Sequence, residues 1–257
     1  MNSFRVLQFN MQFGQGWRDV NPDRAPVNLE ASIAEIQKQD ADIVMLQEVE
    51  HAQAGGLQRD PPPNYSRIRA ALPGYEGAFA YPRPDPRELP FGIGLAVLSR
   101  TAVTEPLRVD LPSPPIPFEF RGRALTPTDR VLLGVTTSLA GREVRLLNTH
   151  LLAFFMLGTT TGEHPEQMEQ VGAILASSTL PTILTGDFNV SNHEDLVARY
   201  AELGFSTVQT AEATWRRKPF VLDHIFHNRP LRCVAKSVIP TPCSDHHMLV
   251  ADFEFAG

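Results

Sequence analysis

The sequence predicts an α/β protein, and three features of its 257 residues support this prediction. Short apolar runs of strand length alternate with longer stretches whose apolar residues have helical spacing. The first three of these stretches form a β-α-β unit, which places two strand ends side by side at one edge of a sheet. Polar residues follow several of the apolar runs, where the loops of an open α/β sheet commonly build a binding site.

The β-α-β unit opens the chain. Strands are expected at Phe4–Phe9 and at Ile43–Leu46, because both are short runs rich in apolar residues. Between them, Leu29–Lys38 carries apolar residues three and four positions apart, which predicts a helix.

The middle of the chain is rich in proline, since 14 of the 22 prolines lie between Pro61 and Pro127. Proline breaks helices and confines strands to sheet edges, so long loops are expected here around strands at Ile93–Leu98 and Val103–Val109. Strands resume on both sides of this region, and the polar clusters described below span the chain. Residues 1–257 are therefore expected to form a single domain.

The later part of the chain is regular again, with five further strands and two helices expected. The strands are Val131–Thr136, Val144–Asn148, Thr182–Thr185, Val221–Phe226 and Leu249–Phe253, and the helices are His164–Ala176 and His193–Leu203.

Composition limits the class of protein. Apolar residues make up 42% and charged residues 20%, which is typical of a folded globular protein. The net charge of 23 − 29 = −6 argues against tight, non-specific binding to duplex nucleic acid. Cys233 and Cys243 are the only cysteines, which leaves at most one disulfide bond. No signal peptide is recognised, and the longest apolar run, Leu151–Leu157, is too short to span a membrane, so a cytoplasmic location is expected.

Motifs of several common enzyme classes are absent: the phosphate loop GxxxxGKS/T, the zinc helix HExxH, the nucleophile elbow GxSxG and the dinucleotide turn GxGxxG. Six short polar clusters are present instead, each at the end of a predicted strand. They are Gln8-Phe9-Asn10, Gln47-Glu48-Val49, Asn148-Thr149-His150-Leu151, Gly186-Asp187-Phe188-Asn189, Leu222-Asp223-His224-Ile225 and Ser244-Asp245-His246-His247.

The residue types in these clusters suit one kind of chemistry. The carboxylates of Glu48, Asp187 and Asp245 and the amides of Asn10 and Asn189 are hard oxygen ligands, which favour Mg²⁺ or Mn²⁺ over zinc.

The histidines complete this chemistry. His150 and His246 can donate hydrogen bonds to a phosphoryl oxygen, and Asp223 can orient a histidine and raise its pKa. A hard cation, a base for water and imidazole donors together predict hydrolysis of a phosphate ester.

The six clusters resemble those of the endonuclease/exonuclease/phosphatase family, in the family's order and with compatible spacing from Asn10 to His246. GDFN and SDH are weak strings individually, whereas the six clusters together are specific. The resemblance implies a DNase I-like, four-layer α/β sandwich of two packed mixed β-sheets flanked by helices. It also implies in-line attack of water on a phosphate ester, dependent on Mg²⁺ or Mn²⁺, without a covalent intermediate.

The resemblance assigns roles on the metal side of the site. Glu48 is similar to the direct metal ligand of the family. Asn10 corresponds to a second ligand, either direct or through water, and Asp245 to a further carboxylate on the metal side.

The remaining assignments concern the nucleophile and the phosphate. Asp187 resembles the residue that aligns and deprotonates the attacking water, and Asn189 the residue that orients the nucleophile or the phosphate. His246, paired with Asp223, and His150 resemble the two histidines that contact the phosphate. Whether Asp187 or His246 is the general base stays open at this point.

Each residue also has a structural interpretation when it is taken alone. Asn10 and Asp187 can close a turn or cap a helix, Glu48 can end a strand in solvent, and His150 can be a satisfied structural histidine. The catalytic interpretation is favoured because all of these structural roles would otherwise have to imitate one family pattern together.

The substrate is less well defined. Arg216, Arg217 and Lys218 precede the Asp223 strand and form either a solvated loop or a phosphate contact. The apolar run Leu151–Leu157 is either a core segment or a stacking surface beside the site. We expect a nuclease-like phosphodiesterase acting on nucleic acid or a nucleotide-like ester. The alternative is a lipid or inositol phosphate head group. An inactive binding scaffold is less favoured, because no position of the catalytic set is missing.

Overall fold

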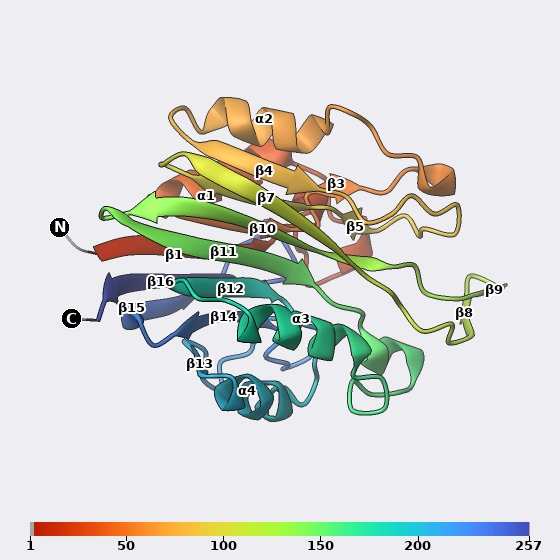
Figure 1. Cartoon of the computed structure of the whole chain (residues 1–257). Coiled ribbons are helices and arrows are strands. Elements are labelled where there is room, and N and C mark those ends of the chain that lie inside the picture. The colour runs from red at the N-terminus through yellow and green to blue at the C-terminus, as the bar shows by residue number, and fades with distance from the viewer. Residues whose placement is uncertain (1–2, 257) are drawn as a thin grey trace.

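The computed structural model describes residues 3–256, which form two six-stranded sheets packed against each other (Figure 1). The first sheet has the order β15 (Leu231–Ile239), β16 (Met248–Phe255), β1 (Ser3–Asn10), β2 (Ile43–Gln47), β6 (Leu95–Ser99) and β4 (Glu76–Ala80). The second has the order β13 (Phe205–Thr207), β14 (Asp223–Asn228), β12 (Thr182–Asp187), β11 (Arg142–His150), β10 (Arg130–Leu139) and β7 (Val103–Leu111).

Both sheets are mixed, as predicted. β1 pairs in parallel with β2 and antiparallel with β16, and β12 pairs in parallel with β11 and antiparallel with β14. The parallel β1–β2 pair confirms the predicted β-α-β opening, whose helix α1 spans Leu29–Lys38.

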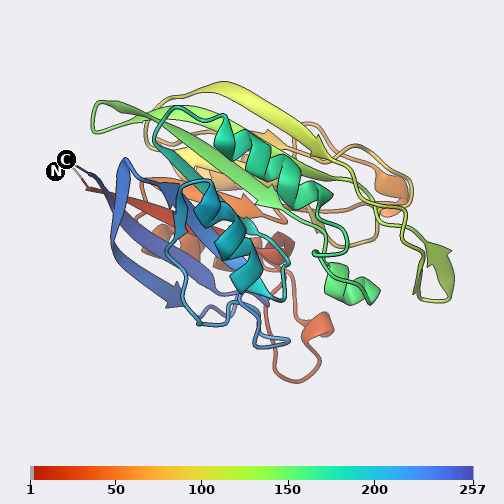
Figure 2. The ribbon, with the colours of Figure 1, turned by 60° about the horizontal axis from the view of Figure 1, so that its bottom comes forward.

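Four helices cover the outer faces of the two sheets. Helices α1 and α2 (Pro63–Ala71) pack on the first sheet, and α3 (Glu166–Ala176) and α4 (His193–Glu202) pack on the second (Figures 1 and 2). Three hydrophobic cores separate the layers: one between the sheets, one beneath α1 and α2, and one beneath α3 and α4. The predicted four-layer sandwich is thereby confirmed.

The alternation of side chains along each strand assigns residues to these cores. On β1, Phe4 and Val6 point into the core between the sheets, whereas Leu7 and Phe9 point toward α1. This central face turns polar near the carboxyl end of the strand, because the next residues on it are Gln8 and Asn10.

The proline-rich region corrects one prediction, because it contains more than loops and two strands. Helix α2 begins at Pro63 within it, where proline is tolerated since the first N–H groups of a helix have no intrahelical partner. The region also forms β4, the short strand β5 (Gly92–Ile93), which pairs with β3 (Glu50–His51), and the hairpin of β8 (Phe118–Phe120) and β9 (Arg123–Leu125). Strand β15 was not predicted either, because it is an edge strand with many exposed residues and a register shift after Cys233.

Short 3₁₀ helices complete the elements: η1 (Gln12–Gly14), η2 (Pro22–Arg24), η3 (Ala54–Gly56) and η4 (Phe154–Leu157). Both cysteines are free thiols, so the disulfide bond that the sequence left open does not form. Within residues 3–256, no helix combines the length and the apolar character that crossing a membrane requires.

Candidate active site

Strand pairing gathers the predicted residues at one end of the sandwich. Asn10 ends β1 and Glu48 directly follows β2, and these two strands are parallel neighbours in the first sheet. In the second sheet, His150 ends β11 and lies opposite Asp187, which ends the parallel strand β12. Both sheets therefore bring polar side chains to the same end of their shared interface.

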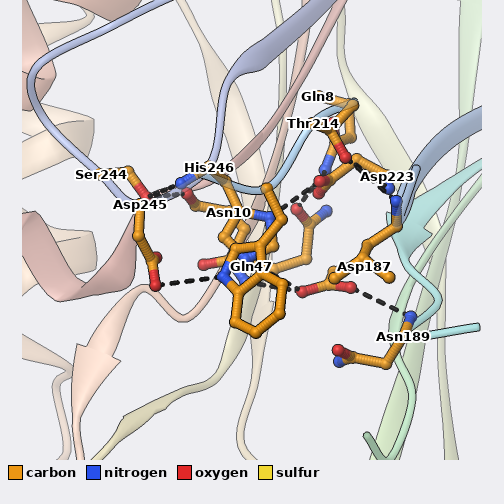
Figure 3. Close-up of polar contacts among 12 residues, drawn as sticks. Gln8, Asn10, Gln47, Asp187, Asn189, Thr214, Asp223, Ser244, Asp245 and His246 are labelled. Carbon is orange, nitrogen blue, oxygen red and sulfur yellow. Dashed lines mark hydrogen bonds and ion pairs between the residues drawn. The ribbon is translucent and has the colours of Figure 1, made fainter. Parts of the chain in front are cut away.

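Asp223 reaches this point from a different direction. It begins β14 rather than ending it, and antiparallel pairing places it opposite Asp187. Asp245 and His246 lie in the loop before β16. Ser244 fixes this loop, since its hydroxyl donates to the Asn10 carbonyl at 2.7 Å and accepts from the His246 backbone N–H at 3.0 Å (Figure 3).

The buried carboxylate of Asp187 and the partly buried carboxylate of Glu48 share the amide of Asn10. Its Nδ2 donates to Glu48 Oε1 at 3.1 Å and to Asp187 Oδ2 at 3.0 Å. Burial, with the charge of Asp245 added, raises the pKa of Glu48 to about 7, and burial raises the pKa of Asp187 to about 8. The positive charge of His246 nearby does not outweigh the effect of burial on these two carboxylates, and such an environment suits a divalent cation.

The backbone around Glu48 is adapted to this placement. Glu48 has a φ of 51°, in the left-handed region that few side-chain-bearing residues adopt. Gly92 on β5 lies so close that a Cβ atom there would be 2.2 Å from Glu48 Oε2. A glycine is therefore needed at this position for Glu48 to occupy its place.

The two histidines converge on Asp187. Nε2 of His246 and Nε2 of His150 each lie 3.6 Å from Asp187 Oδ2. His246 Nδ1 lies 2.8 Å from Asp223 Oδ2, which is the predicted pairing (Figure 3).

Their surroundings give the histidines opposite charge preferences. Burial lowers the pKa of His246, but the charges of Asp223 and Asp187 outweigh it and raise this pKa well above its ordinary value. Burial, followed by the positive charges of Arg130 and His246, lowers the pKa of His150 well below its ordinary value. The surroundings therefore favour the protonated form of His246 and the neutral form of His150.

Asn189 holds the strand end that carries Asp187. Its backbone N–H donates to Asp187 Oδ1 at 3.1 Å (Figure 3). Its side-chain Nδ2 donates to the Leu151 carbonyl at 3.0 Å. The Leu151 N–H in turn donates to the Asp187 carbonyl at 3.0 Å. The segments after β11 and β12 are thereby tied together.

A buried network beneath the site was not among the predicted site residues. Gln8 Nε2 donates to Gln47 Oε1 at 2.7 Å and to Asp223 Oδ1 at 2.8 Å, and Gln47 Nε2 donates to Asn148 Oδ1 at 2.6 Å. These bonds connect the two sheets and orient Asp223 toward His246. The signal in the sequence was the strand period of two, which places Gln8 on the same face as Asn10.

Thr214 supports Asp223 from outside the strands, since its hydroxyl accepts from the backbone N–H groups of Leu222 and Asp223, both at 3.1 Å.

Arg130 is a second residue that the prediction missed. It begins β10, beside the Val131–His150 pair, and its buried Nε has no hydrogen-bond partner. Its positive charge lies close enough to His150 to help lower the pKa of that imidazole.

Two residues that are not predicted metal ligands hold the carboxylate of Asp245. Trp215 Nε1 donates to Asp245 Oδ2 at 3.2 Å and Arg217 Nε donates to the same oxygen at 2.8 Å. Arg217 also donates to Asp23 at 2.8 Å.

The predicted basic segment therefore borders the site, but two of its members are held by the protein. Arg216 donates to the Thr241 carbonyl at 2.6 Å, and Arg217 is paired as described above. Lys218 is exposed, with its ammonium 5.7 Å from the centre of the Phe220 ring. Contact of these three residues with substrate stays a prediction.

One group of metal-ligating types lies especially close together within residues 3–256: the ligand atoms of Asp187, Asp223 and His246 are all within 4.8 Å of one another. This set differs from the predicted metal residues Glu48, Asn10 and Asp245. The closeness of Asp223 and His246 reflects their direct hydrogen bond. The predicted metal residues stay a prediction.

Comparisons with known proteins bear on the family and the fold of the chain. A sequence model of the endonuclease/exonuclease/phosphatase family matches residues 7–246. A UPF0294 protein of Yersinia enterocolitica is 31% identical over 144 residues, which cover 54% of this chain and 53% of that protein. The chain thus spans about half the length of the curated relatives it matches.

Solved structures resemble the whole chain in fold. An endonuclease/exonuclease/phosphatase from Beutenbergia cavernae has a TM-score of 0.71 at 23% identity, and covers 100% of this chain and 72% of its own. The human nocturnin catalytic domain with bound sulfate anion has a TM-score of 0.66 at 19% identity, and covers 99% of this chain and 94% of its own.

Proposed function

Because the chain belongs to the endonuclease/exonuclease/phosphatase family, we propose that it is a metal-dependent phosphodiesterase of the nuclease-like kind. The observation that carries this proposal is the convergence of both histidines on Asp187 Oδ2, with the Glu48 carboxylate beside them. In the reaction, a water oxygen bonds to phosphorus as the opposite ester P–O bond breaks. The products are a phosphomonoester and an alcohol.

Mg²⁺ or Mn²⁺, when bound, would polarise a phosphoryl oxygen and offset the buried carboxylate charge. Glu48 would hold the ion directly, and its raised pKa without a cation supports this assignment. Asp245 and Asn10 would complete the site. Because Asn10 donates its amide nitrogen to Glu48, it would contact the ion through water rather than directly.

Asp187 takes the proton of the attacking water in this proposal. Its pKa of about 8 suits a base that works near neutral pH, and the Asn189 backbone N–H fixes its other oxygen. His246 is a weaker candidate for the base, because the charges around it keep it protonated. It instead donates from Nε2 to a phosphoryl oxygen, while Asp223 holds Nδ1.

Neutral His150 and Arg130 contribute on the opposite side of the phosphate. His150 has Nε2 directed at the same carboxylate oxygen, and Arg130 offers the unpartnered N–H. Positive charge confined to the site, from Arg130 and His246, fits a chain whose net charge of −6 opposes broad electrostatic binding.

Hydrolysis of bis-p-nitrophenyl phosphate with Mg²⁺ or Mn²⁺ tests the reaction. EDTA should abolish release of p-nitrophenol, and added metal should restore it. Full activity in EDTA would contradict the proposal. A panel of single- and double-stranded DNA, RNA, sphingomyelin and inositol phosphates then separates the nuclease-like reading from the lipid and inositol alternatives.

A further inference from the structure

Gln8 is a buried polar residue that reaches from one sheet to the other. It lies on β1 of the first sheet and is 0% exposed. Its Nε2 donates at 2.8 Å to Oδ1 of Asp223, which begins β14 of the second sheet and is also buried (Figure 3). The other carboxylate oxygen, Oδ2, lies 2.8 Å from His246 Nδ1. Gln8 thus holds one oxygen of the carboxylate whose other oxygen holds the histidine.

The other contacts of Asp223 leave the plane of its carboxylate dependent on Gln8. The Thr214 hydroxyl accepts from the Asp223 backbone N–H, and Gln209 donates to the Asp223 carbonyl, so both act on the main chain. Among the described residues, only Gln8 donates to Oδ1. The last torsion of an aspartate side chain has broad minima, so a partner on each oxygen is needed to fix the carboxylate plane.

Backbone carbonyls fix the direction in which the Gln8 amide points. Asn148 Nδ2 donates to two carbonyls of the first sheet, at 2.8 and 3.1 Å, and a carbonyl can only accept. The Asn148 oxygen must therefore face Gln47, whose Nε2 donates to it at 2.6 Å. The Gln47 oxygen in turn accepts from Gln8 Nε2 at 2.7 Å. The network thus turns the NH₂ group of Gln8, rather than its oxygen, toward Asp223.

The same arrangement destabilises the fold in one respect. Gln8 Oε1 is buried and has no hydrogen-bond partner among the described residues. A buried acceptor without a partner is unfavourable, and an apolar side chain at this position would avoid it. Gln47 and Asn148 already join the two sheets by their own hydrogen bond. The amide at position 8 therefore points to a role at Asp223 beyond holding the sheets together.

We infer that Gln8 is a positioning residue of the proposed reaction: it fixes the plane of the Asp223 carboxylate, which in turn directs His246 Nε2 at the phosphoryl oxygen. This inference rests on the proposed function and adds a residue to its machinery. Gln8 contacts neither phosphate nor metal in this scheme, so its whole effect passes through Asp223.

Gln8→Met tests this role, because methionine has a similar length and shape but no donor. In hydrolysis of bis-p-nitrophenyl phosphate, kcat should fall by on the order of tenfold, since a hydrogen bond to a charged group is lost. KM and the Mg²⁺ concentration for half-maximal activity should stay within about twofold of the wild-type values, because Gln8 binds neither substrate nor ion. Thermal unfolding checks that the variant is folded, and Gln8→Leu replaces it if it is not.

A double-mutant cycle shows whether Gln8 acts through Asp223. In an Asp223→Asn background, Gln8→Met should lower kcat by less than about twofold, since the carboxylate that Gln8 positions is already gone. Gln170→Leu is the matched control, because the Gln170 amide on α3 donates to the Asp110 carbonyl at 3.0 Å, outside the network. It should leave kcat and KM unchanged. An equal loss of kcat in both backgrounds, or an unchanged kcat in the folded single variant, would overturn the inference.

A measurement without turnover keeps this test separate from the proposed function. The Nδ1–H proton that His246 shares with Asp223 can be followed by NMR at constant pH and assigned by its loss in His246→Ala. Its resonance should shift or broaden in Gln8→Met and stay in place in Gln170→Leu. If the wild type hydrolyses nothing with metal but this resonance responds, Gln8 positions Asp223 and the catalytic proposal fails. If hydrolysis occurs but neither kcat nor the resonance changes, only the inference on Gln8 fails.

Discussion

The histidine that contacts two acids is the residue on which the proposed chemistry depends most. His246 lies 2.8 Å from Asp223 and 3.6 Å from Asp187, and both charges favour its protonated form over the opposing effect of burial. His150 Nε2 also lies 3.6 Å from Asp187 Oδ2, but among the described residues no carboxylate lies within hydrogen-bond distance of its ring. Burial lowers the pKa of His150, which favours its neutral form. The pKa values of two residues of one type thus shift in opposite directions because their neighbours differ.

Replacing Asp223 with asparagine should lower kcat by on the order of 100-fold or more, because His246 loses the charge that keeps it a donor. The pKa of His246 should fall, and activity that needs its protonated form is lost as pH rises through that pKa. The alkaline limb of the pH–rate profile should therefore move to lower pH. Exposed Asp195→Asn in α4 is the control and should leave the profile unchanged. A lower kcat with an unmoved limb would show that Asp223 acts only structurally.

At the scale of elements, periodicity predicted the parts that carry the site. The apolar run before Asn10 and the helix at Leu29–Lys38 are visible in one stretch of sequence, and both were found. The six clusters lie at strand boundaries, so their gathering at one sheet end could be predicted as well.

What could not be predicted depends on the facing sheet. Gln47 and Asn148 are 101 residues apart in sequence, and their hydrogen bond exists only because two sheets pack face to face. Arg130 is similar, because its place beside His150 follows from strand pairing. Helix α2 was hidden by its prolines, which stand at its start rather than in its interior.

Strand β5 offers a test of how tightly the elements hold Glu48. In Gly92→Ala, the new Cβ would fall 2.2 Å from Glu48 Oε2, so the carboxylate must move. If Glu48 binds the metal, the Mg²⁺ concentration for half-maximal activity should rise about tenfold or more, which corresponds to about 1.4 kcal/mol. A magnesium titration of activity measures this.

Gly162→Ala is the matched control, because its nearest neighbour would be Thr160 Oγ1 at 3.7 Å, an ordinary contact. Its magnesium requirement should equal that of the wild type. An unchanged titration in folded Gly92→Ala would remove Glu48 from the metal site.

The net charge of −6 is a sum over the whole molecule, and it does not give the charge at the site. Asp187 is buried and Glu48 is partly buried at the strand ends, and in the proposed function a cation would offset their charge there. The positive charge of Arg130 acts on both Glu48 and His150, so the site contains positive as well as negative groups. The negative net charge therefore weakens binding of a phosphate-bearing substrate along an extended surface, but it does not prevent recognition of a phosphate at the site itself.

Buried histidines should also make the whole fold sensitive to acid. His224 is fully buried against Phe226, with Nδ1 3.0 Å from Thr207 Oγ1, and burial, reinforced by His193, lowers its pKa from 6.5 to about 3. Between these two values the unfolded chain binds a proton that the folded chain does not. The contribution of His224 is thus complete above pH 6.5 and is lost as pH falls toward 3, by roughly 1.4 kcal/mol per pH unit.

His224→Phe should remove this dependence, because phenylalanine cannot take up a proton in either state. Urea unfolding of both proteins from pH 7 to pH 4 gives their free energies of unfolding. The difference between wild type and variant isolates His224, since Glu48 and Asp187, whose pKa values burial raises, contribute equally to both. The wild type should lose stability relative to the variant as pH falls, and a difference that stays constant across this range would mean that folding does not lower the pKa of His224.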